Sequence, residues 1–149
     1  MWEKISRFVA IRPRSEREID LWLRKKRVDT NEALELKEKL HSLDLLDDLA
    51  FATWWIDQRN TFRPKGKKLL IYELKQKGVK GGVIEEALGA SDFDERELAK
   101  RVVAKYDQRE PEKLVTLLQR RGFSWETISG IMPNDDNQGW ICREIGQSC

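Results

Sequence analysis

The stretch that decides the fold is IDLWLRKKRV, from Ile19 to Val28. It joins two apolar residues four positions apart to a basic run and a further apolar residue. The same pattern returns as LIYELKQKGV at Leu70–Val79 and as LVTLLQRRGF at Leu114–Phe123. Apolar residues at this spacing indicate one face of a helix, and the glycine in two of the copies is typical of a helix end. A pattern that recurs every 44 to 51 residues predicts one supersecondary unit, repeated and stacked.

Helical periodicity extends over most of the chain, and no segment shows convincing strand alternation. Ser15 and Glu18 form a capping box, in which each side chain accepts a hydrogen bond from a free amide at the start of a helix. Glycines 78 and 122 stand where a helix needs a residue with positive φ to end. The predicted helices cover residues 2–10, 15–26, 31–42, 46–60, 66–77, 82–89, 93–107, 111–121 and 125–131.

These helices predict an all-α fold, an elongated array of tandem three-helix repeats built from helix-turn-helix-like units, with the last repeat incomplete. The predicted parts are an N-terminal lead-in at 1–14, repeats at 15–62 and 63–108, a partial repeat at 109–133 and a polar C-terminal tail at 134–149. We expect the tail to be dispensable for folding, because it has little to bury. A repeat array presents a long surface and rarely a deep pocket, which favours an extended partner.

The composition excludes several classes of protein. Of the 149 residues, 40% are hydrophobic and 36% are charged, with few prolines and glycines, which excludes collagen-like and disordered chains. The apolar runs are too short to span a bilayer, and the chain leads directly into an amphipathic segment, so we expect no signal peptide. The two cysteines, Cys142 and Cys149, provide no disulfide framework. We expect a cytoplasmic monomer.

Charge alternates along the chain in phase with the repeats. Residues 1–27, 60–80 and 101–121 carry net charges of +5, +6 and +3, whereas residues 28–58, 81–100 and 122–149 carry −6, −4 and −3. Repeats stacked in register would align the basic helices as a stripe. Such a stripe is suited to a negatively charged partner, although lysine and arginine are also ordinary residues of a solvated helix face.

Catalytic chemistry is not evident. His41 is the only histidine and belongs to a polar, acidic helix, so a catalytic triad is disfavoured. The basic segment at 64–68 lacks the spacing and the hydroxyl residue of a phosphate-binding loop. We therefore expect no enzyme activity, no cofactor and no metal. Trp22, Trp54, Trp55 and Trp125 lie at or beside apolar helix positions, which favours packing over base stacking.

Six stretches, taken in order, resemble the RecX family of bacterial recombination regulators. They are Arg12–Glu16, Leu45–Asp48 followed by Phe51-Ala52, Arg63–Gly66 with Leu69 and Leu70, Glu73–Val79, Val83–Leu88 and Leu117–Ser124. Two features depart from the family pattern. Arg27 stands where the later copies have glycine, and the chain after Met132 matches nothing recognisable.

The resemblance implies an array of three-helix repeats that acts as a clamp along the groove of the RecA–DNA filament. Members of the family inhibit RecA's ATP hydrolysis, strand exchange and coprotease activity and promote filament disassembly. The candidate residues for binding the filament or DNA phosphate are the basic residues of the repeated helices. They are Arg12, Arg14, Arg24, Lys25, Lys26, Lys65, Lys67, Lys68, Lys75, Lys77, Arg120 and Arg121.

Two other functions stay open at the level of the sequence. The chain could be a sequence-independent DNA-binding protein that coats strands, or a helical-repeat scaffold that binds a peptide. Sequence-specific reading of DNA is disfavoured, because the second helix of each unit is acidic and a DNA groove would repel it.

Overall fold

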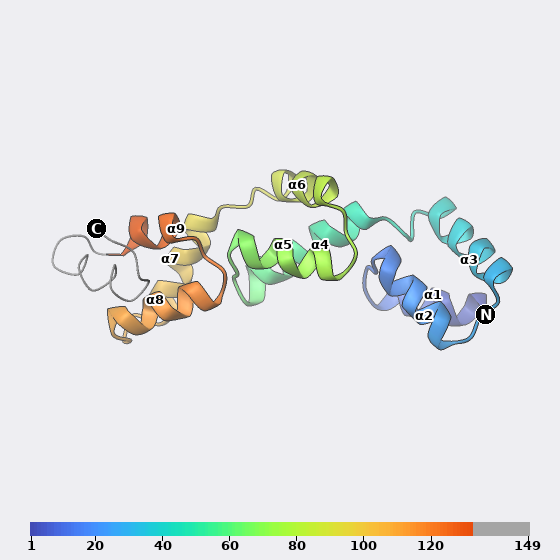
Figure 1. The fold of residues 1–149 in the computed structure, drawn as a ribbon, viewed down its shortest axis with the longest axis horizontal. Coiled ribbons are helices and arrows are strands. Elements are labelled where there is room, and N and C mark those ends of the chain that lie inside the picture. The colour runs from blue at the N-terminus through green and yellow to red at the C-terminus, as the bar shows by residue number, and fades with distance from the viewer. Residues whose placement is uncertain (133–149) are drawn as a thin grey trace. The chain divides into compact units, whose positions relative to one another are not determined.

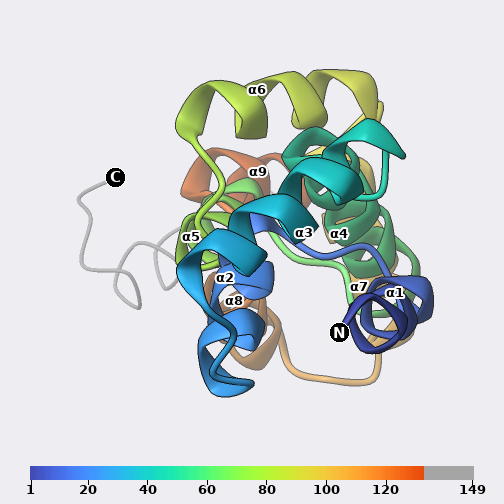
Figure 2. The same ribbon diagram turned by 90° about the vertical axis from the view of Figure 1, so that its right-hand side faces the viewer.

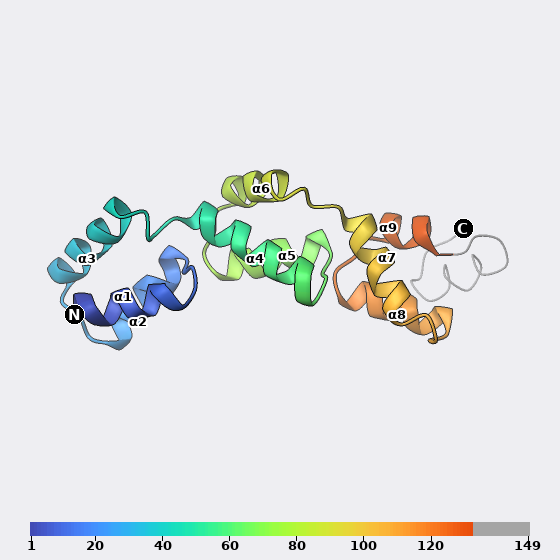
Figure 3. The ribbon, with the colours of Figure 1, turned by 180° about the vertical axis from the view of Figure 1, so that it is seen from behind.

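The computed structural model describes residues 1–132, and within them the chain forms nine α-helices and no strand. Figure 1 shows these helices, with the same ribbon from the side in Figure 2 and from behind in Figure 3. They are α1 Trp2–Ile11, α2 Glu16–Lys25, α3 Thr30–Ser42, α4 Asp48–Phe62, α5 Lys67–Gln76, α6 Gly81–Ala90, α7 Glu95–Lys105, α8 Pro111–Arg120 and α9 Trp125–Ile131. The all-α prediction is confirmed, and each predicted helix begins and ends within two residues of the observed helix. The predicted tail at 134–149 lies outside the described residues.

The chain divides into two compact units. The first comprises Met1–Asp57 and Glu73–Asp92, and the second comprises Gln58–Tyr72 and Phe93–Cys149. The first unit therefore holds α1, α2, α3 and α6, and the second holds α7, α8 and α9. Helices α4 and α5 are each divided between the two units, α4 after Asp57 and α5 after Tyr72. The predicted repeat boundaries stay a prediction.

In the first unit, α1, α2 and α3 bury their apolar faces in one shared core. Its members are Ile5, Ile19, Leu23, Leu36, Leu40 and Leu46. Trp22 stacks on Phe8 with 5.5 Å between ring centroids. Phe51 is fully buried in α4 and packs against both Trp54 and Trp55. The predicted packing role of these tryptophans is confirmed.

In the second unit, α7, α8 and α9 lie side by side around a second core (Figure 1). The buried members are Leu98, Ala99, Val102, Leu114, Val115, Leu118, Phe123, Ile128 and Met132, and Trp125 packs against them. Pro111 begins α8, where its missing amide costs no hydrogen bond. Ser124 caps the start of α9, because its side chain accepts a hydrogen bond from the amide of Thr127.

The turn after the basic run has the same left-handed backbone in all three copies. Gly78 and Gly122 have φ values of 83° and 86°, as predicted, and Arg27 adopts 56°. A side chain in this region costs roughly 1–2 kcal/mol. Arg27 is exposed, so its side chain is accommodated sterically and only the backbone is strained.

Each of the two glycine turns also packs closely against the first turn of another helix. A Cβ on Gly78 would lie 2.8 Å from Cβ of Arg17 in α2, and Arg17 donates a hydrogen bond to the carbonyl of Gln76. In the second unit, a Cβ on Gly122 would collide with Leu69 in α5. There the amide of Gly66 donates to the carbonyl of Arg121 at 2.8 Å. Each glycine therefore serves both its own turn and a close packing contact.

A carboxylate caps the start of each of these entering helices. The first amide of α2, at Glu16, donates to Oδ1 of Asp48, the first residue of α4, at 2.8 Å. The first amide of α5, at Lys67, donates to Oε1 of Glu95, the first residue of α7, at 2.9 Å. Burial raises the pKa of Asp48, although the hydrogen bond from Glu16 opposes that shift. The same device thus occurs once in each unit.

Replacing Arg27 with glycine is expected to stabilise the first unit by about 0.5 kcal/mol. Relief of the left-handed strain exceeds the entropy that glycine adds to the unfolded chain. Urea unfolding followed by tryptophan fluorescence measures the change. The matched control is Arg24→Gly, which removes the same charge inside α2 and should cost about 1 kcal/mol. Equal losses for both variants would contradict the strain argument.

Candidate functional site

The twelve predicted basic residues are divided between the two units. The first unit holds Arg12, Arg14, Arg24, Lys25, Lys26, Lys75 and Lys77, and the second holds Lys65, Lys67, Lys68, Arg120 and Arg121. Their surroundings differ, and these differences separate cations with a packing role from cations that face solvent.

Arg12 and Arg14 are tied into the turn between α1 and α2. Both form ion pairs with Glu18, the capping-box carboxylate of α2. The Arg14 guanidinium lies 3.9 Å from the ring centroid of Phe8, and its Nε donates to the carbonyl of that residue. Burial lowers the pKa of Arg14. These two arginines hold α1 against α2, and the single carboxylate of Glu18 offsets part of their combined charge within the unit.

Three basic residues at the end of α2 face solvent: Arg24, Lys25 and Lys26. Lys75, near the end of α5, is also exposed. Lys77 is half-buried, with its ammonium group 5.4 Å from the ring centroid of Trp55. Exposed cations are the ones available to a partner, so Lys77 combines partial availability with a packing contact.

Lys67 and Lys68 are exposed in the first turn of α5, which contains no acidic residue. Cations at a helix N-terminus are unfavourable because the positive end of the helix dipole repels them. Glu95 offsets this cost at the backbone by accepting the Lys67 amide. The positions of the two ammonium groups therefore destabilise α5. Residues that cost stability in this way are often kept for function, which favours a role in binding.

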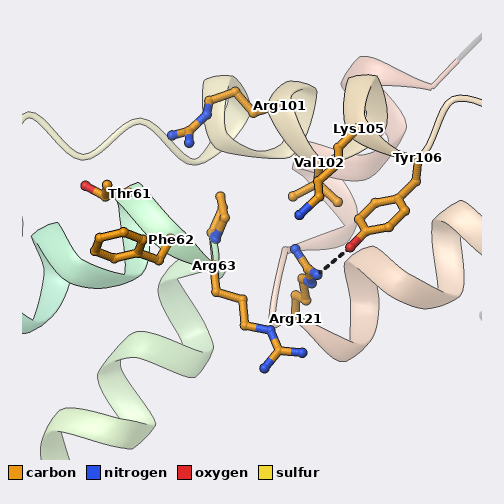
Figure 4. Close-up of a pocket in the computed structure, with 9 residues that line it drawn as sticks. Thr61, Phe62, Arg63, Arg101, Val102, Lys105, Tyr106 and Arg121 are labelled. Carbon is orange, nitrogen blue, oxygen red and sulfur yellow. Dashed lines mark hydrogen bonds between the residues drawn. The ribbon is translucent and has the colours of Figure 1, made fainter.

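A cationic cavity of about 310 Å³ lies within the second unit (Figure 4). Four basic residues line it: Arg63, Arg101, Lys105 and Arg121. The other lining residues are Thr61, Phe62, Pro64, Val102 and Tyr106, so no carboxylate takes part. Only Arg121 was predicted as a site residue. The sequence signal for Arg101 and Lys105 is their four-residue spacing on one helix, which places them on the same face.

Three cationic side chains, those of Lys105, Arg109 and Arg121, lie close to the ring of Tyr106. Its hydroxyl accepts a hydrogen bond from Nη2 of Arg121 at 3.5 Å, drawn in Figure 4. The guanidinium of Arg109 lies 4.5 Å from its ring centroid, and the ammonium of Lys105 lies 5.5 Å from it. The hydrogen bond from Arg121, together with the neighbouring cations, lowers the pKa of Tyr106.

A second cationic hollow, of about 320 Å³, is lined by Arg109, Lys113 and Arg120, together with Glu112, Thr116 and Leu117. Arg120 was a predicted site residue, whereas Arg109 and Lys113 were not. Arg109 connects the two hollows, since it lines this one and also packs on the Tyr106 ring of the first.

No helix of the part that the structure describes is both long enough and apolar enough to cross a bilayer.

Comparison with known proteins gives consistent results. The family model described as RecX, second three-helix domain, matches residues 47–88, a range that covers α4, α5 and nearly all of α6. Regulatory protein RecX of Prosthecochloris aestuarii is 37% identical over 126 residues, which cover 81% of this chain and 83% of that protein. Regulatory protein RecX of Chlorobaculum tepidum is 35% identical over 128 residues, covering 82% and 79%. The match to the Geobacillus thermodenitrificans protein of the same name, 36% identical, spans only 50% of that longer relative.

Two crystal structures share the fold. One, of regulatory protein RecX, aligns with a TM-score of 0.73 over 87% of this chain and 70% of its own. The other, of RecX from Lactobacillus salivarius, aligns with a TM-score of 0.71 over 87% and 90%. Both are 23% identical in sequence, so they support the fold alone.

Proposed function

We propose, from the premise that this chain belongs to the RecX family of regulatory proteins, that it binds the RecA–DNA filament and restrains RecA. Bound to the filament, it inhibits ATP hydrolysis, strand exchange and coprotease activity. It acts by binding and not by catalysis, in the cytoplasm and as a monomer.

The observation that carries this proposal is the extent of the family match. Identity of 37% extends over 81% of this chain and 83% of the relative from Prosthecochloris aestuarii. A match over this length includes the helices of both units, so it goes beyond a single shared motif.

The placement of charge supports the same function. Lys67, Lys68 and Lys75 are exposed on α5, and Arg24, Lys25 and Lys26 are exposed at the end of α2. A RecA–DNA filament is an extended polyanion, and exposed lysines and arginines bind such a partner through salt-dependent contacts. The exposed members of the twelve predicted residues are therefore the proposed binding residues, with Arg12 and Arg14 supporting the fold around them.

The test is RecA-dependent ATP hydrolysis on single-stranded DNA, measured with and without this protein. Hydrolysis is expected to fall as the protein is added to preformed filaments, at protein concentrations far below that of DNA nucleotides. Because too little protein is then present to coat the strands, inhibition under these conditions contradicts a simple strand-coating function. An unchanged rate would overturn the proposed function, as would hydrolysis of ATP by this chain alone.

A further inference from the structure

Two helix starts in this chain are each covered by the same pair of elements, which we call a receiving site. A glycine turn packs against the helix start, and a carboxylate accepts a hydrogen bond from its first amide. For α2 the two parts are the turn at Gly78 and the carboxylate of Asp48. For α5 they are the turn at Gly122 and the carboxylate of Glu95. In both cases the carboxylate begins the helix that comes just before the glycine turn's own helix, α4 before α5 and α7 before α8.

The helix starts fit closely into their receiving sites. Ser15, which precedes α2, is fully buried, and Gly66, which precedes α5, is also buried. A Cβ on the glycine of either turn would lie too close to Cβ of the helix that it receives, at Arg17 or at Leu69. A receiving site therefore requires glycine in the turn, because any side chain would hold the helix start away.

The turn after α2 lacks both parts of a receiving site. Arg27 occupies the position of the glycine, with a Cβ where the other two turns have none. The helix before α2 is α1, and its first residue is Trp2 instead of a carboxylate. The Trp2 ring packs on Lys39 of α3, whose ammonium group lies 4.0 Å from the ring centroid. Glu3 follows one residue later, which places it roughly 100° further around the helix.

Arg27 occupies its position at a cost in stability. Among residues 1–132, the other residues with positive φ are the two glycines and two aspartates, Asp44 and Asp92. Aspartate enters this region more readily because its short polar side chain can form local hydrogen bonds, and arginine lacks that compensation. Arginine here both strains the backbone and blocks a contact that glycine would allow, which indicates that the block has a use.

The helix start left without a receiving site among the described residues is that of α8, and its charge is complementary to the turn after α2. Glu110 precedes α8 and Glu112 lies in its first turn, and both are exposed. The residues before Arg27, at positions 24–26, are three exposed cations. The α8 start of one copy would therefore be attracted to the α2 turn of another. A head-to-tail contact of this kind does not close, so it would produce open chains of molecules.

Pro111 removes the other half of such a contact. The first residues of α2 and α5, Glu16 and Lys67, donate their amides to the carboxylates of the receiving sites. Pro111 is the first residue of α8 and has no N–H group to donate. The start of α8 therefore has one amide fewer that needs a partner.

We infer that Arg27 and Pro111 are stop residues, which prevent one copy of this chain from binding head to tail to another. Arg27 excludes an incoming helix start through its Cβ, and Pro111 removes the amide that a receiving site would bind. The attraction between the acidic α8 start and the basic α2 turn therefore does not lead to self-association. This inference concerns contacts between copies of the chain, so it is independent of RecA and goes beyond the proposed function.

The experiment is sedimentation equilibrium of the full chain, under reducing conditions and over a range of protein concentrations. The variant Arg27→Gly/Pro111→Ala is expected to associate at least about tenfold more strongly than the unchanged protein. Its average mass should rise past that of a dimer, because each head-to-tail contact leaves one helix start and one turn open. The matched control is Arg27→Asn/Pro111→Ala. Asparagine removes the same charge and tolerates the positive φ but keeps a Cβ, so the control should stay as monomeric as the unchanged protein.

A second pair of variants identifies the surface that docks. In the associating variant, the added changes Glu110→Lys and Glu112→Lys should abolish association, because lysines at the α8 start are repelled by the cations at 24–26. The control adds Glu85→Lys and Glu86→Lys instead, which reverses two exposed charges on α6. Association should then persist. Persistent association after the reversal at the α8 start would overturn α8 as the docking helix.

The single variant Arg27→Gly keeps the inference testable if the loss of Pro111 disturbs α8. It should associate more strongly than the unchanged protein and less strongly than the double variant. Association equal to that of the double variant would overturn the role of Pro111. Equal association by the glycine and asparagine pairs would overturn the role of the Arg27 Cβ, since the charge alone would then explain the result. A glycine pair that associates no more than the unchanged protein would overturn the inference as a whole.

Discussion

Replacing Gly66 with alanine is expected to destabilise the second unit by about 3 kcal/mol or more. A Cβ at this position falls on the carbonyl of Gly122 and the amide of Phe123, both backbone groups that cannot rotate away. Relieving the overlap forces α5 away from the turn after α8 and breaks the hydrogen bond from the Gly66 amide to Arg121. Thermal unfolding followed by far-ultraviolet circular dichroism should show a midpoint lower by about 10 °C.

The control is Gly130→Ala in the same unit. Gly130 lies in α9, and a Cβ there would meet only the guanidinium carbon of Arg96, at an ordinary 3.9 Å. Alanine favours helix over glycine by about 1 kcal/mol, so this variant should be unchanged or more stable. A Gly66→Ala protein as stable as the Gly130→Ala protein would show that α5 does not pack closely on the turn after α8.

The sequence predicted the helices well because their signals are local. Apolar spacing gave each helix, the Ser15–Glu18 capping box gave the start of α2, and Gly78 and Gly122 gave the ends of α5 and α8. The sequence indicated the positive φ of both glycines. It did not indicate that each glycine also packs against the first turn of another helix, because that contact joins residues far apart in the chain.

The site was predicted less completely for the same physical reason. The cationic cavity gathers side chains from three separate segments, residues 61–64, 101–106 and 121, and no single stretch reveals it. Conversely, Arg12 and Arg14 belong to a basic stretch, yet both form ion pairs with Glu18 from the next helix, which offsets part of their charge. Glu18 was expected to cap α2, and its second role requires the fold to bring the three side chains together.

Reversing the charge of Lys67, Lys68 and Lys75 together is expected to abolish inhibition of RecA. All three are exposed on α5, so their replacement with glutamate leaves the cores intact. At a negatively charged surface each glutamate adds repulsion where an attraction has been removed, and the affinity should fall by about a hundredfold or more. The measurement is RecA-dependent ATP hydrolysis on single-stranded DNA across a titration of the variant. Lys77 is left unchanged because it packs on Trp55.

The matched control reverses Lys4, Lys80 and Lys100, which are exposed and outside the twelve candidate residues. It produces the same change in net charge, so any effect of overall electrostatics acts on both variants alike. Retained inhibition by the control, with loss in the α5 variant, would place the binding residues on α5. Similar losses in the two variants would show that net charge alone governs the interaction, because a long-range field does not depend on which helix carries the lysines. Retained inhibition by the α5 variant would exclude these three lysines as binding residues.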